Sequence, residues 1–319
     1  FENAKKEVDK LLADPKTKDK TETIMWKVYV YSALYADPTL SSKYPEASQE
    51  AYDALTKYAA IEPDLKKMKE NGLDPLSNLY IVSFNRGKEF FTQKTYDKAY
   101  DYFLLSKKTS EFIGKNGLNS SGSYTIDTTV ILYTAFSAQN AAKTAEAVAN
   151  YKELADWKVA DKEYIDNYKF LLNHYTAQGD KENFTKYLEL SRQLYPADAS
   201  LWNQYDMNFQ SQNSSIAEMV SKYKQDDAAG KLTENDYVSY GENFATPDKS
   251  QADKLDSAAK SELKKTASDA FAKAFNTSKN GLYAFNAGVL QYNVFGELDD
   301  RYYGFRGESP ALKAARTEV

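Results

Sequence analysis

The residue types that most often carry out catalysis are scarce in this chain. Its 319 residues include no cysteine and one histidine, His174. Cysteine nucleophiles, thiolate metal sites and any site that needs two imidazoles are therefore excluded. A serine triad would need a nucleophile and an acid beside that histidine, and no Gly-x-Ser-x-Gly turn supplies the nucleophile. We interpret His174 as a packing or surface residue, and we predict no catalytic residue, no metal site and no cofactor.

Carboxylates are the remaining candidates for acid–base chemistry. Adjacent acids occur at Asp226–Asp227 and at Asp299–Asp300. A glycosidase would place two opposed acids across a sugar-binding cleft. Acids in this chain lie mainly near predicted helix ends, where the helix dipole favours negative charge. A hydrolase with an unrecognised acid pair is therefore the weakest of three functional hypotheses. No calcium loop, Walker loop or dinucleotide-binding glycine motif is present in the sequence.

The charge balance and the chain start limit the partners. Lysine and arginine number 41 against 46 aspartates and glutamates, a formal charge of −5. A nucleic-acid partner would need a basic stripe, so none is expected. No run of about 18 apolar residues occurs, so the sequence predicts no membrane-spanning helix. The chain begins at Phe1. We expect a processed or trimmed product, which leaves room for a lipid anchor upstream.

Composition and periodicity predict helices throughout. Glycine and proline are sparse, 13 and 8 residues, so turns are few and elements long. Apolar residues recur every three or four positions, as in Tyr164 to Tyr175, and no convincing series of alternating strands occurs. The β-prone segment from Thr23 to Ala36 also fits a helix. We predict about 14 helices, including a single helix of about 28 residues from Ser250 to Ser278.

The segment GKEFFTQKTYDKAYDYFLLS, Gly87 to Ser106, resembles the tetratricopeptide repeat. Gly87 falls at the small position of the repeat's first helix, and Tyr96 at the tyrosine between the helices. Ala99 and Phe103 fall on the small–aromatic face of the second helix. A small residue lets two antiparallel helices approach closely, and the aromatic side chains fill the space to the next pair. This segment is the clearest copy.

Further copies extend the resemblance over about two thirds of the chain. In the copy from Tyr168 to Pro196, Phe184 stands where a small residue is expected, so we predict looser packing in that pair. Weaker copies include Trp26 with Ala51 to Pro63, Ala135 to Leu154, the segment that Trp202 leads, Ala267 to Ala274, and Phe285 to Asn293 (FNAGVLQYN). The resemblance implies an all-α fold: a right-handed α-solenoid of antiparallel helix pairs forming a tetratricopeptide-like superhelix. We expect residues 1–319 to form one continuous domain, with a softer division near 115–123.

Composition also suggests a compartment. The richness in tyrosine, the absence of cysteine and the opening AKKEVDKLL (Ala4 to Leu12) resemble tetratricopeptide proteins of the Bacteroidota cell envelope. The resemblance implies an exported protein that is periplasmic or associated with the outer membrane. Two triplets, Asp127–Thr128–Thr129 and Asp256–Ser257–Ala258, match the short O-glycosylation sequon described for that group. Thr128 and Ser257 are therefore predicted acceptors.

A tetratricopeptide superhelix binds its partners on a concave face lined by first helices. Carrying the repeat's groove positions onto this chain predicts a partner-binding set of aromatic, amide and lysine side chains: Phe84, Lys88, Phe91, Phe136, Gln139, Lys169, Asn173, Thr176, Asn203, Met207, Gln210, Phe285 and Tyr292. Amides pair with an extended peptide backbone and aromatic rings receive its side chains. The leading hypothesis is a non-enzymatic protein–protein scaffold that binds another protein or peptide in an envelope assembly. The alternative is a glycan- or oligosaccharide-binding protein on a helical scaffold.

Overall fold

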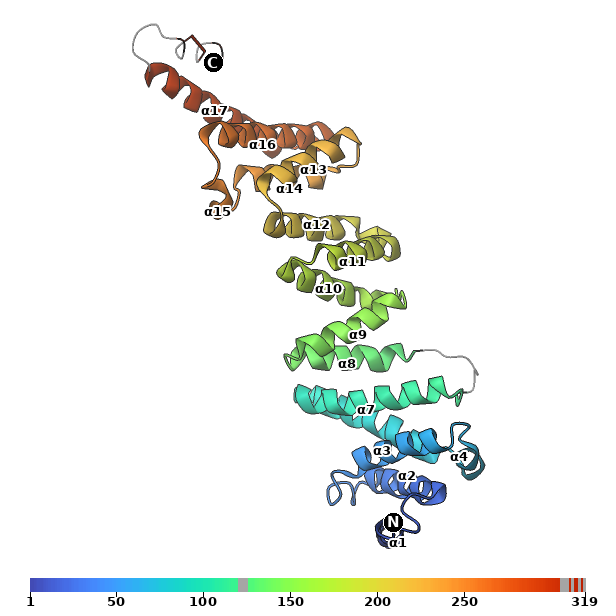
Figure 1. Cartoon of the computed structure of the whole chain (residues 1–319). Helices are drawn as coiled ribbons and strands as arrows, with labels where there is room; N and C mark the ends of the chain where they lie inside the picture. The colour runs from blue at the N-terminus through green and yellow to red at the C-terminus, as the bar shows by residue number, and fades with distance from the viewer. Residues whose placement is uncertain (120–125, 305–309, 311–312, 315–316, 318–319) are drawn as a thin grey trace. The chain divides into compact units, whose positions relative to one another are not determined.

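The computed structural model describes residues 1–119, 126–304, 310, 313–314 and 317, without the side chains of residues 299–304 (Figure 1). Within these ranges every regular element is a helix and no strand occurs, which confirms the predicted all-α class. The chain divides into two compact units, Phe1–Asn167 and Tyr168–Val319, which are described separately. Part of the segment 115–123, where the sequence predicted a softer division, lies outside the described residues.

The first unit is built from helices that pack in sequential pairs. Its helices are α1 (Glu2–Ala13), α2 (Thr21–Ala36), α3 (Ala47–Ile61), α4 (Lys66–Asn71), α5 (Asp74–Ser77), α6 (Ser83–Thr92), α7 (Tyr96–Lys115), α8 (Thr128–Asn140) and α9 (Thr144–Asp156). A π-helical turn, Asn78–Val82, joins α5 to α6. Helix α2 packs on α3, α6 on α7, α8 on α9, and α7 also on α8. The segment from Thr23 to Ala36 is helical, as expected.

The α6–α7 pair shows why the sequence needs a small residue at its first helix. A Cβ atom at Gly87 would lie 2.7 Å from the ring of Phe103, closer than side chains normally pack. Phe103 is fully buried, and the rings of Phe84, Phe91 and Tyr133 surround it. The close helix approach predicted at Gly87 is confirmed, and the structure identifies Phe103 as the ring that packs against it.

The second unit contains the remaining helices. They are α10 (Ile165–Gln178, which begins in the first unit), α11 (Lys181–Leu194), α12 (Ala199–Asn213), α13 (Ile216–Ala228), α14 (Glu234–Ala245), α15 (Lys249–Ala252), α16 (Ser257–Ser278) and α17 (Gly281–Gly304). Helix α16 packs on both α14 and α17. The core there includes Tyr223, Phe244 and Phe271. Trp202, which leads a weak repeat copy, is fully buried, and its indole donates to the Tyr195 carbonyl at 2.9 Å.

One expectation about the second unit is wrong. The predicted single helix from Ser250 to Ser278 is two helices, because the chain leaves the helical path between α15 and α16. The Asp256 carboxylate caps α16 by accepting from the Ala259 amide at 2.8 Å, and such a side chain favours a helix start over a helix interior. Phe184 is buried and stacks on Phe209 of α12, with the ring centroids 4.1 Å apart, and the looser packing expected between α10 and α11 stays a prediction.

Candidate functional site

The predicted groove positions on α6 serve mainly in packing. Phe84 and Phe91 are half-buried, and each meets the rings of Phe103 and Tyr133 edge-on. Lys88 is exposed, with its ammonium 5.8 Å from the centre of the Phe84 ring. The two phenylalanines therefore pack mainly on the neighbouring helices, and their role in a partner-binding face stays a prediction.

On α8, Phe136 is half-buried against the ring of Tyr151, while Gln139 is exposed and accepts a hydrogen bond from the Tyr151 hydroxyl at 2.5 Å. On α10, Lys169 is half-buried and Asn173 is exposed. Thr176 is buried, and its hydroxyl donates to the Leu172 carbonyl at 2.8 Å. Since a buried side chain cannot meet a partner, Thr176 is removed from the predicted set.

Three predicted residues of α12 do come together at a hollow. Asn203, Met207 and Gln210 lie at intervals of four and three along one face of the helix, and they line a pocket of about 290 Å³ in the second unit. Helix α12 also contributes Asp206. The rest of the wall comes from α11 (Arg192), α13 (Lys222 and Asp226), the α13–α14 loop (Lys231 and Leu232) and α14 (Asp236 and Tyr240). We call this the α12 pocket.

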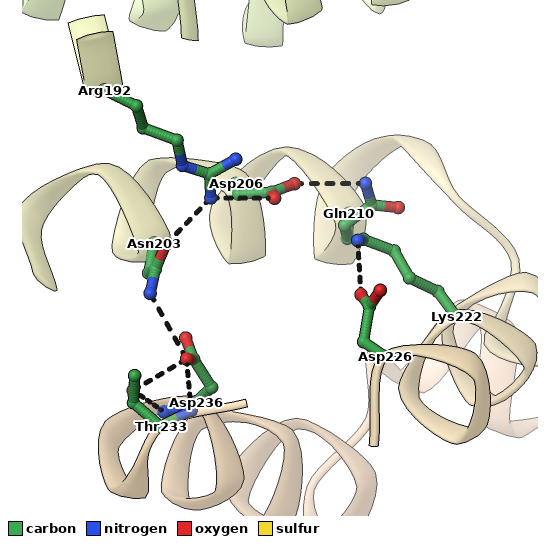
Figure 2. A network of polar contacts seen from close by, with 8 residues as sticks. All are labelled: Arg192, Asn203, Asp206, Gln210, Lys222, Asp226, Thr233 and Asp236. Atoms are coloured by element: carbon green, nitrogen blue, oxygen red, sulfur yellow. Dashed lines mark hydrogen bonds and ion pairs between the residues drawn. The ribbon is translucent and has the colours of Figure 1, made fainter. Parts of the chain in front are cut away.

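A chain of hydrogen bonds orients one side of the α12 pocket (Figure 2). Arg192 reaches across from α11, and one terminal nitrogen donates to the Asn203 carbonyl oxygen at 2.8 Å and to Asp206 at 3.2 Å. The Asn203 amide then donates to Asp236 at 3.2 Å. Asp206 also accepts from the Gln210 amide at 3.3 Å. Three helices, α11, α12 and α14, are linked in this way.

Helix capping fixes the acid at the far end of this chain. Asp236 sits three residues after Thr233, and the two residues form a capping box at the start of α14. The Thr233 hydroxyl donates to the Asp236 carboxylate at 2.6 Å, and the Thr233 amide donates to it at 2.8 Å. The same carboxylate also faces the pocket.

The charges of the α12 pocket balance. Asp226 pairs with Lys222 of the same helix, with nitrogen and oxygen 2.7 Å apart (Figure 2). Lys231 is exposed and makes no ion pair with any described residue. With Arg192, Lys222 and Lys231 opposing Asp206, Asp226 and Asp236, the lining holds three positive and three negative groups. The pocket therefore has no net charge.

Tyr240 of α14 contributes a hydroxyl group to the wall of the α12 pocket. Its side chain is 3% exposed, and its hydroxyl has no hydrogen bond to any described residue. Burial raises the pKa of the Tyr240 phenol, and the carboxylates of Asp206, Asp226 and Asp236 raise it further. The hydroxyl stays protonated at neutral pH and is available to a ligand.

The other predicted groove residues lie on α17. Phe285 is 67% exposed and Tyr292 is 73% exposed, the largest exposures among the large apolar side chains of the described residues. Leu282, Val289 and Phe295 are exposed on the same side of the helix, whereas Ala287, Leu290 and Val294 are buried on the opposite side. We call the exposed row of Leu282, Phe285, Val289, Tyr292 and Phe295 the α17 stripe.

The two predicted glycosylation sites lie at helix starts. Asp127 caps α8 by accepting from the Val130 amide at 3.0 Å, as Asp256 caps α16, so each triplet has a structural role as a capping sequence. Thr128 is half-buried, and its hydroxyl accepts from Tyr164 at 2.9 Å. Ser257 is exposed. Modification of either residue stays a prediction.

The remaining chemistry-bearing residues form no second site. His174 is half-buried against the rings of Phe170 and Tyr175. The side chains of Asp299 and Asp300 lie outside the described residues. The described part of the chain contains no group of three or more histidine and carboxylate side chains arranged to hold a metal ion. No helix within it combines the length and the apolarity needed to cross a bilayer.

Comparison with protein-family models, with curated proteins and with solved structures finds no match for this chain.

Proposed function

We propose that this protein is a non-enzymatic scaffold that binds another protein, and that its helix pairs continue as a right-handed tetratricopeptide-like solenoid. The packing at Gly87 and Phe103 supports the repeat interpretation. A second instance lies between α14 and α16, where a Cβ atom at Gly241 would lie 3.0 Å from the ring of Phe271. The proposed location, an exported protein in an envelope assembly, rests on the resemblance of its composition and opening segment.

The single observation that carries the binding proposal is the α17 stripe. Exposed apolar side chains are ordinary when scattered, but a contiguous row marks an interaction surface. The stripe lies on a helix with no charged residue from Gly281 to Gly296. The polar side chains of this segment are three amides, Asn286, Gln291 and Asn293, and two tyrosines, so its exposed side lacks the charged face of a typical surface helix. Among the described residues, α16 packs on the side of α17 that holds Ala287 and Leu290.

The expected occupant is an amphipathic helix of a partner protein. The stripe runs from Leu282 to Phe295, about 20 Å at 1.5 Å per residue, which is the contact length of one short helix. Since the stripe bears no charge, apolar packing and shape provide the recognition, and we expect binding to depend weakly on salt.

Affinity capture followed by reconstitution tests this proposal. The bait carries Phe285→Ser and Tyr292→Ser together, and wild type is the reference. A protein captured by wild type is purified, and its affinity for both baits is measured by calorimetry. Burying about 100 Å² on each of two aromatic side chains corresponds to a few kcal/mol, so we expect the double variant to lose at least tenfold in affinity.

The matched control is Ile81→Ser, which removes another exposed apolar side chain, 50% exposed, from the first unit. This control should bind within about twofold of wild type. The proposal is contradicted if wild type captures no protein in larger amount than the double variant does. If light scattering shows that wild type is a dimer and that the double variant is a monomer, the α17 stripe is instead a self-association surface.

A further inference from the structure

We propose that the α12 pocket binds a neutral polyhydroxylated ligand, a sugar unit of a carbohydrate, at a site separate from the α17 stripe. The inference rests on four features of the pocket: its unused hydrogen-bonding groups, its balanced charge, its apolar wall and its size.

The polar groups of the α12 pocket that still have hydrogen-bonding capacity suit a ligand that both donates and accepts hydrogen bonds. The Tyr240 hydroxyl is buried at the pocket wall and has no partner among the described residues. Asp226 and Asp236 each accept through Oδ2, and neither Oδ1 accepts a hydrogen bond from a described residue. Arg192 donates through one terminal nitrogen only. Sugar hydroxyls donate to carboxylates and accept from guanidinium and phenol groups at the same time.

The charge balance argues against an ionic ligand. A cation near Asp226 would also meet Lys222 and Arg192, and an anion near Arg192 would meet Asp206. Four of the six charged groups are thus paired with one of the opposite sign, and the other two, Lys231 and Asp236, also differ in sign, so neither kind of ion gains net attraction. A neutral ligand avoids this cost and uses the same groups as hydrogen-bonding partners.

The apolar wall and the size fit a pyranose ring. Met207, Leu232 and the ring of Tyr240 provide apolar surface beside the polar groups, as the C–H face of a sugar requires. The volume of about 290 Å³ lies at the lower end of the range for ligand pockets, about 300 Å³. A neighbouring hollow of about 510 Å³ shares Arg192 and Asp226 with the pocket, so a second sugar unit has room.

The same contacts favour binding over hydrolysis. A glycosidase needs one acid free to deliver a proton and another free to attack or to activate water. Here Asp206 is bonded to Arg192 and Asp226 to Lys222. Asp236 is engaged by the start of its own helix. Carboxylates held in this way orient hydroxyl groups, and they suit a ligand that leaves the site unchanged.

Titration of the full chain with defined small molecules tests the inference. The probes are neutral sugars (glucose, galactose, mannose, N-acetylglucosamine and their disaccharides), with lysine methyl ester as the cation and phosphate as the anion. Saturation-transfer NMR detects binding and calorimetry measures it. We expect at least one neutral sugar to bind, and neither ion to compete with it.

Two variants locate the binding. Tyr240→Phe removes only the unpartnered hydroxyl, and Asp226→Asn removes one acceptor. We expect each to weaken sugar binding roughly fivefold or more, with the thermal midpoint measured to confirm folding. The matched control is Tyr283→Phe, a half-buried tyrosine of the same unit outside the pocket, which should bind within about twofold of wild type.

Three results would overturn the inference. The first is no binding of any neutral sugar to wild type at ~50 mM. The second is binding that Tyr240→Phe and Asp226→Asn both leave unchanged. The third is binding of lysine methyl ester or phosphate in preference to the sugars, which would assign the pocket to an ion. None of these results bears on the α17 stripe, because the variants lie outside it.

Discussion

Substituting the glycine between α6 and α7 should destabilise the first unit, against the usual trend for a helical glycine. Gly87→Ala places a Cβ atom 2.7 Å from two atoms of the Phe103 ring, where ordinary carbon contacts are about 3.5–4.0 Å. Phe103 cannot retreat, because the Phe84 and Tyr133 rings lie 5.6 and 5.2 Å from it, centre to centre.

The magnitude follows from two opposing terms. Overpacking a tight core costs about 1–3 kcal/mol. Replacing a glycine inside a helix by alanine contributes about 0.5–1 kcal/mol in the other direction. Taking the middle of each range, about 2 less about 0.75 kcal/mol, we expect Gly87→Ala to lower the free energy of unfolding by about 1 kcal/mol, measured by urea unfolding with circular dichroism.

The control for this prediction is a helical glycine with open space around it. A Cβ atom at Gly288 of α17 would meet nothing within 4 Å, so Gly288→Ala should stabilise the protein by about 0.5–1 kcal/mol. Hydrogen exchange assigns each change to its unit. A Gly87→Ala variant as stable as wild type, or more stable, would refute the close-packed helix pair.

Three further predictions concern the ends and links of helices. The Lys273 ammonium and the Tyr237 hydroxyl hold the pKa of the Asp227 carboxyl below its ordinary value of 3.8. The contribution of these two contacts to the stability of the folded protein is therefore complete above pH 3.8, and it is lost as pH falls through the lowered pKa. The urea midpoint should therefore fall less steeply below about pH 4 in Asp227→Asn than in wild type, and equal slopes would count against this link. Asp256→Ala should cost about 1 kcal/mol in urea unfolding because α16 loses its cap, whereas Asp256→Ser, which can still cap, should cost less. If the predicted sequon is used, peptide mass mapping should find the sugar on exposed Ser257, and a modified Thr128 beside an unmodified Ser257 would contradict the structure.

The helices and their closest contacts could be predicted because they depend on local pattern. The spacing of apolar residues predicted the all-α class, and the small residue at Gly87 predicted a close approach of two helices, although not that Phe103 is the ring it meets. The break between Ser250 and Ser278 was missed because the helical pattern continues across it. Capping by Asp256 and by Asp248 decides the two helix starts, and such side chains leave only a weak mark on the periodicity.

The α12 pocket could be predicted only in part. Asn203, Met207 and Gln210 share one helix, so a fixed spacing identifies them. Arg192 and Tyr240 reach the same hollow from other helices, and no spacing rule relates them to α12. A residue's position in the repeat also predicts which way its side chain points, but it does not predict whether that side chain is buried. For that reason Thr176 was placed on a partner surface although it is buried.

Hydrogen exchange of the reconstituted complex tests the central claim, a protein partner bound on the α17 stripe. The backbone amides of α17 are compared in the free protein and in the complex, with α6 as the internal reference. We expect α17 to become protected between Gly281 and Gly296 while α6 is unchanged. Protection elsewhere, with α17 exchanging as in the free protein, would contradict the account.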